Sequence, residues 1–484
     1  SPFPDRPVQL IRIDGNGHCQ VEPSAAKILE QIHGRLAVVG IAGLYRTGKS
    51  FLLNRLLGLQ DGFEIGPSVN PCTKGLWIWG QPVQLASDFH CVFIDTEGLG
   101  SAQRTASCDM QIFSLCILLS SLFIYNSMGA IDEQAIEDLH LVLNLAKHIH
   151  SRSGNGTQDS AARDFAGFLP SFMWVLRDFH LKLVDEHGDA MTSRNYLENA
   201  LKQNHGQEKQ NQLRAVIREL FPDRECMTLA RPCVDESDLR HVQKLPYESL
   251  RPQFREQVEE FTRKVYTSMR PKKVEGVPLS GPMLVRLATE YCKAINNSGV
   301  PAIRSAWTYA VQSQLRSSLK DAIQEYRAQM NDMAMSHLPM AEERLRELHR
   351  DCKARALEIF LAPGFSEDDG QFREYRAELA RRIKQLYDHV KAENGSTSRQ
   401  QCQSMAEELY RSMIQSKLSV KGTYQSVEEL MRDWEVVQKA YVERTAGPAQ
   451  VEIMSSVLFQ RMTESVNRLC DQKKLDERRT RSCA

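Results

Sequence analysis

The sequence has no excess of either charge and no apolar run long enough to cross a membrane. Lysine and arginine together number 61, and aspartate and glutamate together also number 61, so the formal net charge is zero. Nucleic-acid-binding proteins usually carry a basic excess, so we expect no specific nucleic-acid partner. The most apolar stretch, residues 112–126, is shorter than the roughly 20 residues of a membrane-spanning helix. We therefore predict no transmembrane segment and interpret this stretch as a buried helix that leads into a buried strand.

Cysteine occurs 12 times but never as a C-x-x-C pair, and no stretch has the pattern of a signal peptide. Cys91 and Cys116 lie within apolar runs and are predicted to be small core residues. Thiols in this arrangement are typical of a reducing compartment, so we expect a cytoplasmic or nuclear protein without disulfides.

The first half of the chain alternates between short apolar runs and helical patterns. The apolar runs at residues 35–43, 88–98, 121–126 and 172–179 are continuous rather than alternating, which is typical of strands buried on both faces of a parallel sheet. Helical patterns such as residues 49–58 lie between these runs. The alternation predicts an α/β fold with a mostly parallel sheet.

The second half of the chain has a helical pattern throughout. Glycine and proline interrupt the sequence at residues 270–282, and no convincing strand follows. Apolar residues then recur at steps of three and four, as expected of amphipathic helices. One such series consists of Leu345, Leu348, Cys352, Ala356 and Ile359. We predict an elongated all-α helical bundle, with helix breaks at residues 361–370 and 391–398.

These patterns predict three segments along the chain. Residues 1–275 form the α/β domain, residues 276–310 form a linker and the start of the helical region, and residues 311–484 form a helical middle domain. The length of 484 residues agrees with two or three domains.

The stretch "GLYRTGKS", from Gly43 to Ser50, has the G-x-x-x-x-G-K-S pattern of a phosphate-binding loop. It follows a predicted strand and precedes a predicted helix, which is the context that the motif requires. Backbone N–H groups at the helix N-terminus are expected to hold the β-phosphate. Lys49 is expected to reach the β- and γ-phosphate oxygens, and Ser50 to coordinate Mg²⁺.

Two further segments are expected to complete the phosphate site. "DTEG" places Asp95 at the end of a predicted strand, where it holds Mg²⁺ through water, and Gly98 three residues later, where its N–H meets the γ-phosphate. Between this segment and the loop, Thr73 is the best candidate for a threonine that closes on Mg²⁺. The alternative for Thr73 is an ordinary loop threonine before a strand.

The sequence lacks the N/T-K-x-D motif that reads guanine in most GTPases. The best substitute is "VLRD", in which Arg177 and Asp178 end a predicted buried strand. Two interpretations of Asp178 remain open. It forms a strand-end salt bridge, or it accepts hydrogen bonds from the guanine base.

In this order and spacing, the stretches "GLYRTGKS", "TKGLWIW", "DTEGLG" and "WVLRDF" resemble the guanylate-binding proteins, large GTPases of the dynamin superfamily. Residues 71–77 and 221–232 look closer to the plant-type members. The related atlastins share the R-D signature, but their transmembrane hairpin is missing, which disfavours membrane fusion.

The resemblance implies roles for individual residues. Arg46, inside the loop, is expected to be an arginine finger that moves onto the γ-phosphate when two GTPase domains pair, and Glu97 is expected to order the attacking water. Asp178 reads guanine, and residues 224–239 form a cap over the base. The implied catalytic residues are Arg46, Lys49, Thr73 and Glu97, and the implied Mg²⁺ residues are Ser50, Thr73 and, through water, Asp95. The implied nucleotide contacts are Gly43, Tyr45, Arg46, Thr47, Gly48, Lys49, Ser50, Phe51, Asp95, Gly98, Arg177, Asp178 and Arg231.

The sequence departs from the family pattern in two places. Pro71 and Cys72 stand where animal members have serine and histidine before the switch threonine, and proline has no hydroxyl with which to position water. The chain also ends near the point where animal members continue into a C-terminal effector helix.

Two main functions are expected. The first is a Mg²⁺-dependent GTPase that dimerises when it is loaded with GTP and drives self-assembly, with a role in immune defence implied by the resemblance. The alternative, which Pro71 keeps open, is a GTP-dependent scaffold with little or no turnover. A third, an ATP-using mechanoenzyme, is the weakest.

Overall fold

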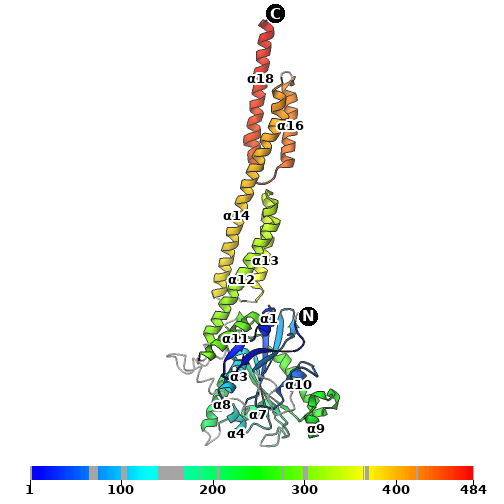
Figure 1. Ribbon diagram of the computed structural model, residues 1–484, viewed down its shortest axis with the longest axis vertical. Helices are drawn as coiled ribbons and strands as arrows, with labels where there is room; N and C mark the ends of the chain where they lie inside the picture. The colour runs from blue at the N-terminus through cyan, green and yellow to red at the C-terminus, as the bar shows by residue number, and fades with distance from the viewer. Residues whose placement is uncertain are drawn as a thin grey trace. The chain divides into compact units, whose positions relative to one another are not determined.

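The computed structural model describes residues 3–64, 75–96, 98–99, 106–139, 168–185, 187–203, 208–274, 277–297, 303–363, 365, 370–420 and 423–482. The chain divides into two compact units. The first comprises Ser1–Gln314 and Ala362–Phe372, and the second comprises Leu315–Leu361 and Arg373–Ala484. Figure 1 shows a sheet with surrounding helices in the first unit and long helices in the second.

A mixed sheet of nine strands, counted over the described residues, is the centre of the first unit. The strands are β1 (Pro7–Ile13), β2 (Cys19–Val21), β3 (Arg35–Ala42), β4 (Leu76–Trp79), β5 (Val83–Ala86), β6 (Phe89–Thr96), β7 (Leu122–Met128), β8 (Ser171–Arg177) and β9 (Arg224–Leu229). Their order is β2-β1-β4-β6-β3-β7-β8-β9, with β5 paired to β6. The pairs from β6 through β9 are parallel, and β1, β2, β4 and β5 pair antiparallel.

The predicted mostly parallel sheet is confirmed in this unit. Strands β3, β6, β7 and β8 coincide with the four apolar runs of the sequence. The sequence analysis missed β9 and the antiparallel strands. Strands β2, β4 and β5 have only three or four residues, β9 begins with charged residues, and polar residues interrupt β1. These strands therefore lack the long apolar run that is typical of a central parallel strand.

Both faces of β3 are buried, which explains its continuous apolar sequence. Ala37, Val39 and Ile41 share a core with side chains of α2 (Lys49–Leu56) and α10 (Pro252–Ser268). On the other face α3 (Ala106–Leu119) packs so closely that a Cβ atom at Gly40 would lie 2.2 Å from the Oγ of Ser120, which follows this helix. Glycine at this position therefore permits the approach of α3 to the sheet.

Other helices and turns complete the first unit. They are α1 (Pro23–Glu30), α4 (Glu133–Asp138), α7 (Ser193–Ala200), α8 (Glu208–Leu220), α9 (Glu236–Leu239) and α11 (Gly281–Asn296), with 3₁₀ turns at Val242–Lys244 and Tyr247–Ser249 and a small hairpin of β10 (Lys273–Val274) and β11 (Val277–Pro278). The sequence analysis missed this hairpin.

The apolar stretch at residues 112–126 is a buried helix followed by a buried strand, as predicted. It contains the end of α3 and most of β7. The Nζ of Lys272 caps this helix by donating to the carbonyl oxygens of Leu118 and Ser120, each at 2.7 Å. The amine thus satisfies carbonyl groups at the helix C-terminus that have no partner within the helix, and its burial lowers the pKa of Lys272 to about 7. Within the described ranges, no helix combines the length and the apolar character that a membrane span needs.

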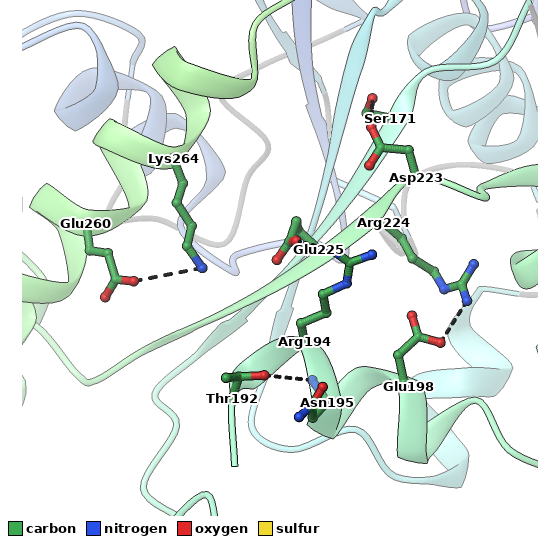
Figure 2. Close-up of polar contacts among 10 residues, drawn as sticks. All are labelled: Ser171, Thr192, Arg194, Asn195, Glu198, Asp223, Arg224, Glu225, Glu260 and Lys264. Atoms are coloured by element: carbon green, nitrogen blue, oxygen red, sulfur yellow. Dashed lines mark hydrogen bonds and ion pairs between the residues drawn. The ribbon is translucent and has the colours of Figure 1, made fainter. Parts of the chain in front are cut away.

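Charged side chains hold α7 beside β9, the last strand in the sheet order (Figure 2). Arg194 of α7 pairs with Glu225 at 3.0 Å, and Arg224 pairs with Glu198 of α7 at 2.7 Å. Thr192 caps the helix by accepting the N–H of Asn195 at 3.1 Å. Such partly exposed ion pairs contribute little stability, but charges on an outer strand discourage pairing with another chain.

The described residues after residue 281 form helices and turns and contain no strand. The helices are α12 (Ile303–Met333), α13 (Glu342–Leu361), α14 (Gly370–Leu409), α15 (Ser416–Leu418), α16 (Val427–Arg444), α17 (Gln450–Ile453) and α18 (Phe459–Ser482), with a 3₁₀ turn at Met335–His337 and π-helical segments at Tyr410–Gln415 and Met454–Leu458. The predicted largely helical second half is therefore confirmed.

Two groups of contacts hold the second unit together. Between α12, α13 and α14, the His349 ring shares a hydrogen bond of 2.8 Å with the Tyr326 hydroxyl and stacks on Tyr387 at 4.0 Å between ring centroids. Further along, α14, α16 and α18 enclose a separate apolar core around Trp434. Figure 1 shows these helices side by side within the unit.

The helix break predicted at residues 391–398 is wrong, because α14 continues through this stretch. Its polar residues serve tertiary contacts instead. The buried Asn394 side chain donates to the Met340 carbonyl at 3.0 Å and accepts the Met340 N–H at 2.8 Å. The buried Ser398 hydroxyl donates to the Ala446 carbonyl at 2.8 Å and accepts the Ala449 N–H at 3.1 Å. These contacts outweigh the weak helix propensity of asparagine, glycine and serine.

We expect Asn394→Ala to destabilise the helical unit by about 1–3 kcal/mol, because it leaves backbone polar groups of Met340 without their partner. Urea unfolding followed by circular dichroism measures the change. Glu393→Ala, at the exposed neighbouring position, is the matched control. Equal effects of the two substitutions would show that the Asn394 contacts do not matter.

Candidate nucleotide site

The loop from Gly43 to Gly48 connects β3 to α2 and has an unusual backbone. Gly43, Arg46 and Gly48 have φ angles of 155°, 63° and 78°, and Gly48 is the N-cap of α2. Positive φ is strained for arginine and easy for glycine. The first N–H groups of α2 have no partner within the helix, and the helix dipole favours an anion at this end.

The loop contacts the carboxyl ends of β6 and β7, the two strands that flank β3 in the sheet. A Cβ atom at Gly43 would lie 2.0 Å from the Asn126 carbonyl oxygen at the end of β7, so a side chain has no room there. Tyr45 donates its N–H to the Leu99 carbonyl at 2.9 Å, and Leu99 donates to the Gly43 carbonyl at 3.1 Å. These contacts bring Gly98, which lies just beyond β6, against Tyr45.

The polar side chains of the loop converge on one end of the sheet. Lys49 donates its Nζ to the Leu44 carbonyl at 3.1 Å, and Thr47 donates its hydroxyl to the same oxygen at 2.8 Å. The Ser50 hydroxyl donates to Oδ2 of the fully buried Asp95 at 2.6 Å. A hydroxyl and a carboxylate side by side are the hard oxygen ligands that Mg²⁺ prefers, so these two residues fit a Mg²⁺ site that phosphates and water would complete.

Arg46 differs from the other polar residues of the loop. Its side chain is exposed, and its guanidinium lies over the Tyr45 ring at 5.7 Å from the ring centroid. Phe51 is the opposite case, because its side chain is buried and stacks on Phe254 of α10 at 6.1 Å. Only the backbone of Phe51 is therefore available to a ligand.

Arg177 lies behind the loop rather than at its open side. Its guanidinium is buried and donates from Nη1 to the carbonyl oxygens of Gly48 at 3.1 Å and Thr47 at 3.4 Å. Burial lowers the pKa of Arg177 to about 10, and the neighbouring Asp178 carboxylate partly opposes this. The fully buried Asn126 amide joins it by donating to the Thr47 carbonyl at 2.8 Å.

Sequence reasoning missed Asn126. Its signal was a polar residue within a strand that is otherwise apolar, next to the strand that leads into a phosphate loop.

Asp178 and Arg231 are the two residues that are predicted to lie at the guanine base. Asp178 follows β8 with a φ of 53°, and its side chain is partly exposed. Burial raises the pKa of Cys233; the nearby carboxylates of Asp238 and Asp178 raise it further, whereas the Arg231 guanidinium opposes them. Asp178 and Arg231 therefore both lie within electrostatic range of Cys233.

Some predicted residues lie outside the described part of the chain. These are Pro71, Cys72, Thr73 and Glu97. Their predicted roles stay predictions, as does the closer likeness to plant-type members.

Similarity to known proteins identifies the family of this chain. Residues 16–274 match the family of guanylate-binding protein N-terminal domains, and residues 275–479 match the family of guanylate-binding protein C-terminal domains.

The chain is 34% identical to guanylate-binding protein 1 of Chlorocebus aethiops over 466 residues, which are 93% of this chain and 77% of that protein. It is 34% identical to guanylate-binding protein 2 of Homo sapiens over 464 residues, again 93% and 77% of the two chains. It is 36% identical to guanylate-binding protein 2 of Rattus norvegicus over 414 residues, which are 84% of this chain and 69% of that protein. The chain therefore belongs to the guanylate-binding protein family of large GTPases.

Proposed function

We propose that this chain is a Mg²⁺-dependent GTPase that carries its own arginine finger and is activated when two loaded GTPase domains pair. The observation that carries the proposal is Arg46. It lies inside the phosphate loop, yet its side chain is exposed and does not bury itself in the loop as Thr47 and Lys49 do. A cation held at this place, beside the phosphates, suits the transition state of phosphoryl transfer.

The remaining residues of the site would bind and orient GTP. Lys49 and the N-terminal N–H groups of α2 would bind the β- and γ-phosphates. Ser50 and, through water, Asp95 would hold Mg²⁺, which neutralises charge that develops on the phosphate oxygens. By the family resemblance, Thr73 would close on the metal ion, and Glu97 would order the attacking water.

Asp178 and Arg231 would form the guanine end of the site. A carboxylate at the end of β8 is able to accept hydrogen bonds from the N1–H and 2-amino groups of guanine. Because β8 and β7 are parallel neighbours, the carboxyl end of β8 lies at the same edge of the sheet as the loop, where nucleotides bind in open α/β sheets.

Dimerisation would complete the site. An exposed Arg46 faces water, where its charge is well screened, and pairing of two domains would exclude that water and strengthen its attraction to phosphate. We propose that residues 1–275 form the pairing domain, that residues 276–310 are the connection and that residues 311–484 transmit the cycle to self-assembly. The scattered free cysteines favour a cytoplasmic or nuclear setting, and family membership favours a role in immune defence.

A scaffold with little turnover is the second candidate, and the observation that favours it is Pro71. This residue has no hydroxyl at the place where animal family members have a serine.

Single-turnover GTP hydrolysis at increasing protein concentration distinguishes the two functions. We expect the rate constant to rise with concentration and then level off, because pairing would bring Arg46 into position. Lys49→Ala is the control, because removal of the ammonium group that would bind phosphate is expected to weaken GTP binding. A slow rate that does not depend on concentration would support the scaffold, and absence of GTP binding by the unchanged chain would contradict both.

A further inference from the structure

Among the described residues, no ion pair holds the buried guanidinium of Arg177, and its Nε has no hydrogen-bond acceptor. The Asp178 carboxylate acts on it only as a neighbouring charge. An unpaired buried charge is costly, and proteins seldom keep one without a reason. Burial lowers its pKa only to about 10, so the group keeps its positive charge at neutral pH.

Arg177 binds two adjacent peptide groups of the phosphate loop, and Asn126 binds one of the same two. Arg177 contacts the carbonyl oxygens of Thr47 and Gly48, and Asn126 contacts that of Thr47. In a trans peptide bond the C=O and the following N–H point in opposite directions. Holding these two carbonyl groups from behind therefore turns the N–H groups of Gly48 and Lys49 toward the open side of the loop.

The packing at Gly48 shows how close this support is. A Cβ atom at Gly48 would lie 3.0 Å from Nη1 of Arg177, and the φ of Gly48 is 78°. The glycine thus permits both the turn and the approach of the guanidinium to the loop.

We propose that Arg177, with Asn126, is a positioning residue that aims the loop N–H groups at the β-phosphate and supplies a positive charge behind them. This inference rests on the proposed nucleotide site. It gives different roles to Arg177 and Asp178, the two residues of the R-D signature. Arg177 acts on the phosphate end, and only Asp178 acts on the base. The phosphates of the bound nucleotide would then add negative charge on the side of the loop opposite the buried guanidinium.

The test compares the Kd values of GMP, GDP and GTP for the full chain and for Arg177→Met, which has a long uncharged side chain. We expect Arg177→Met to weaken GDP and GTP binding about 10- to 100-fold and to change GMP binding by less than about 3-fold, because GMP has no β-phosphate. Arg177→Lys keeps the positive charge but lacks the planar guanidinium with its several N–H donors, so it should recover part of the loss. Asn126→Ala should show the same pattern with a smaller effect.

A second readout separates positioning from folding. For each variant, the rise in Tm that saturating GDP produces is compared with the rise that saturating GMP produces. We expect Arg177→Met to reduce the rise with GDP and to leave the rise with GMP unchanged. A general structural defect would lower the Tm of the nucleotide-free protein and reduce both rises.

Three outcomes would overturn the inference. Equal losses for GMP, GDP and GTP would assign Arg177 to the base, and unchanged affinities would make it a packing residue. If Arg177→Met does not fold, equal losses for the three nucleotides in Arg177→Lys and Asn126→Ala decide against it. Failure of the unchanged chain to bind GTP would contradict the proposed function, and so differs from all three.

Discussion

Replacing Arg46 by alanine is expected to slow GTP hydrolysis by about 10³- to 10⁵-fold while leaving GTP affinity within a few-fold. A finger residue stabilises charge that develops in the transition state more than it stabilises the bound substrate. The structure agrees with a small effect on binding, because the exposed Arg46 side chain lies over Tyr45. Single-turnover kinetics at saturating protein concentration, with Kd measured separately, gives both quantities.

Arg46→Lys is the matched control for this substitution. Alanine and lysine are both non-glycine residues and meet the positive φ of 63° with similar strain, so a difference between them reports on the side chain. Lysine keeps the charge but lacks the planar fork of arginine, and we expect it to recover only part of the rate. A large loss of affinity with unchanged turnover would make Arg46 an ordinary phosphate ligand.

Replacing Asp178 by asparagine is expected to exchange the base preference from guanine to xanthine. The amide would place a donor opposite the N1–H of guanine, and unpaired polar groups at a buried contact cost about 1–3 kcal/mol, or roughly 5- to 150-fold in affinity. Xanthine has a carbonyl at position 2, so it pairs with the amide. Competition of GTP, XTP and ATP against a fluorescent nucleotide measures the exchange in both proteins.

The backbone conformation at position 178 tolerates Asp178→Asn without added strain. Asp178 has a φ of 53°, and asparagine adopts positive φ more readily than most residues. Asp178→Ala should lose GTP without gaining XTP, which separates base reading from a general loss of structure. If the asparagine variant keeps its preference for GTP, the strand-end salt bridge becomes the better interpretation of Asp178.

The sequence was sufficient to predict a feature wherever one short segment contains all the residues that indicate it. The phosphate loop from Gly43 to Ser50 was predictable, because its glycines, lysine and serine lie within eight consecutive positions between a strand and a helix. The strands β3, β6, β7 and β8 were predictable for the same reason, since burial on both faces requires continuous apolar runs. The family followed from four such segments in their order.

Tertiary structure decided the features in which distant residues meet. A helix break was predicted at residues 391–398 because local propensity is weak there, but contacts of Asn394 with Met340 and of Ser398 with Ala446 keep α14 continuous. Strands β1, β2, β4 and β5 owe their places to pairing partners rather than to their own patterns.

In the candidate site, too, the sequence indicated some features and the tertiary structure decided others. The sequence alone predicted that Arg177 and Asp178 stand at the end of a buried strand, and it made them candidates for a nucleotide site. It did not determine that the Arg177 guanidinium lies behind the loop and binds the carbonyl groups of Thr47 and Gly48, or that Asn126 joins it. Those contacts join β7, β8 and the loop across about 80 to 130 positions of chain, and only the parallel pairing of the strands brings their carboxyl ends to the same edge of the sheet.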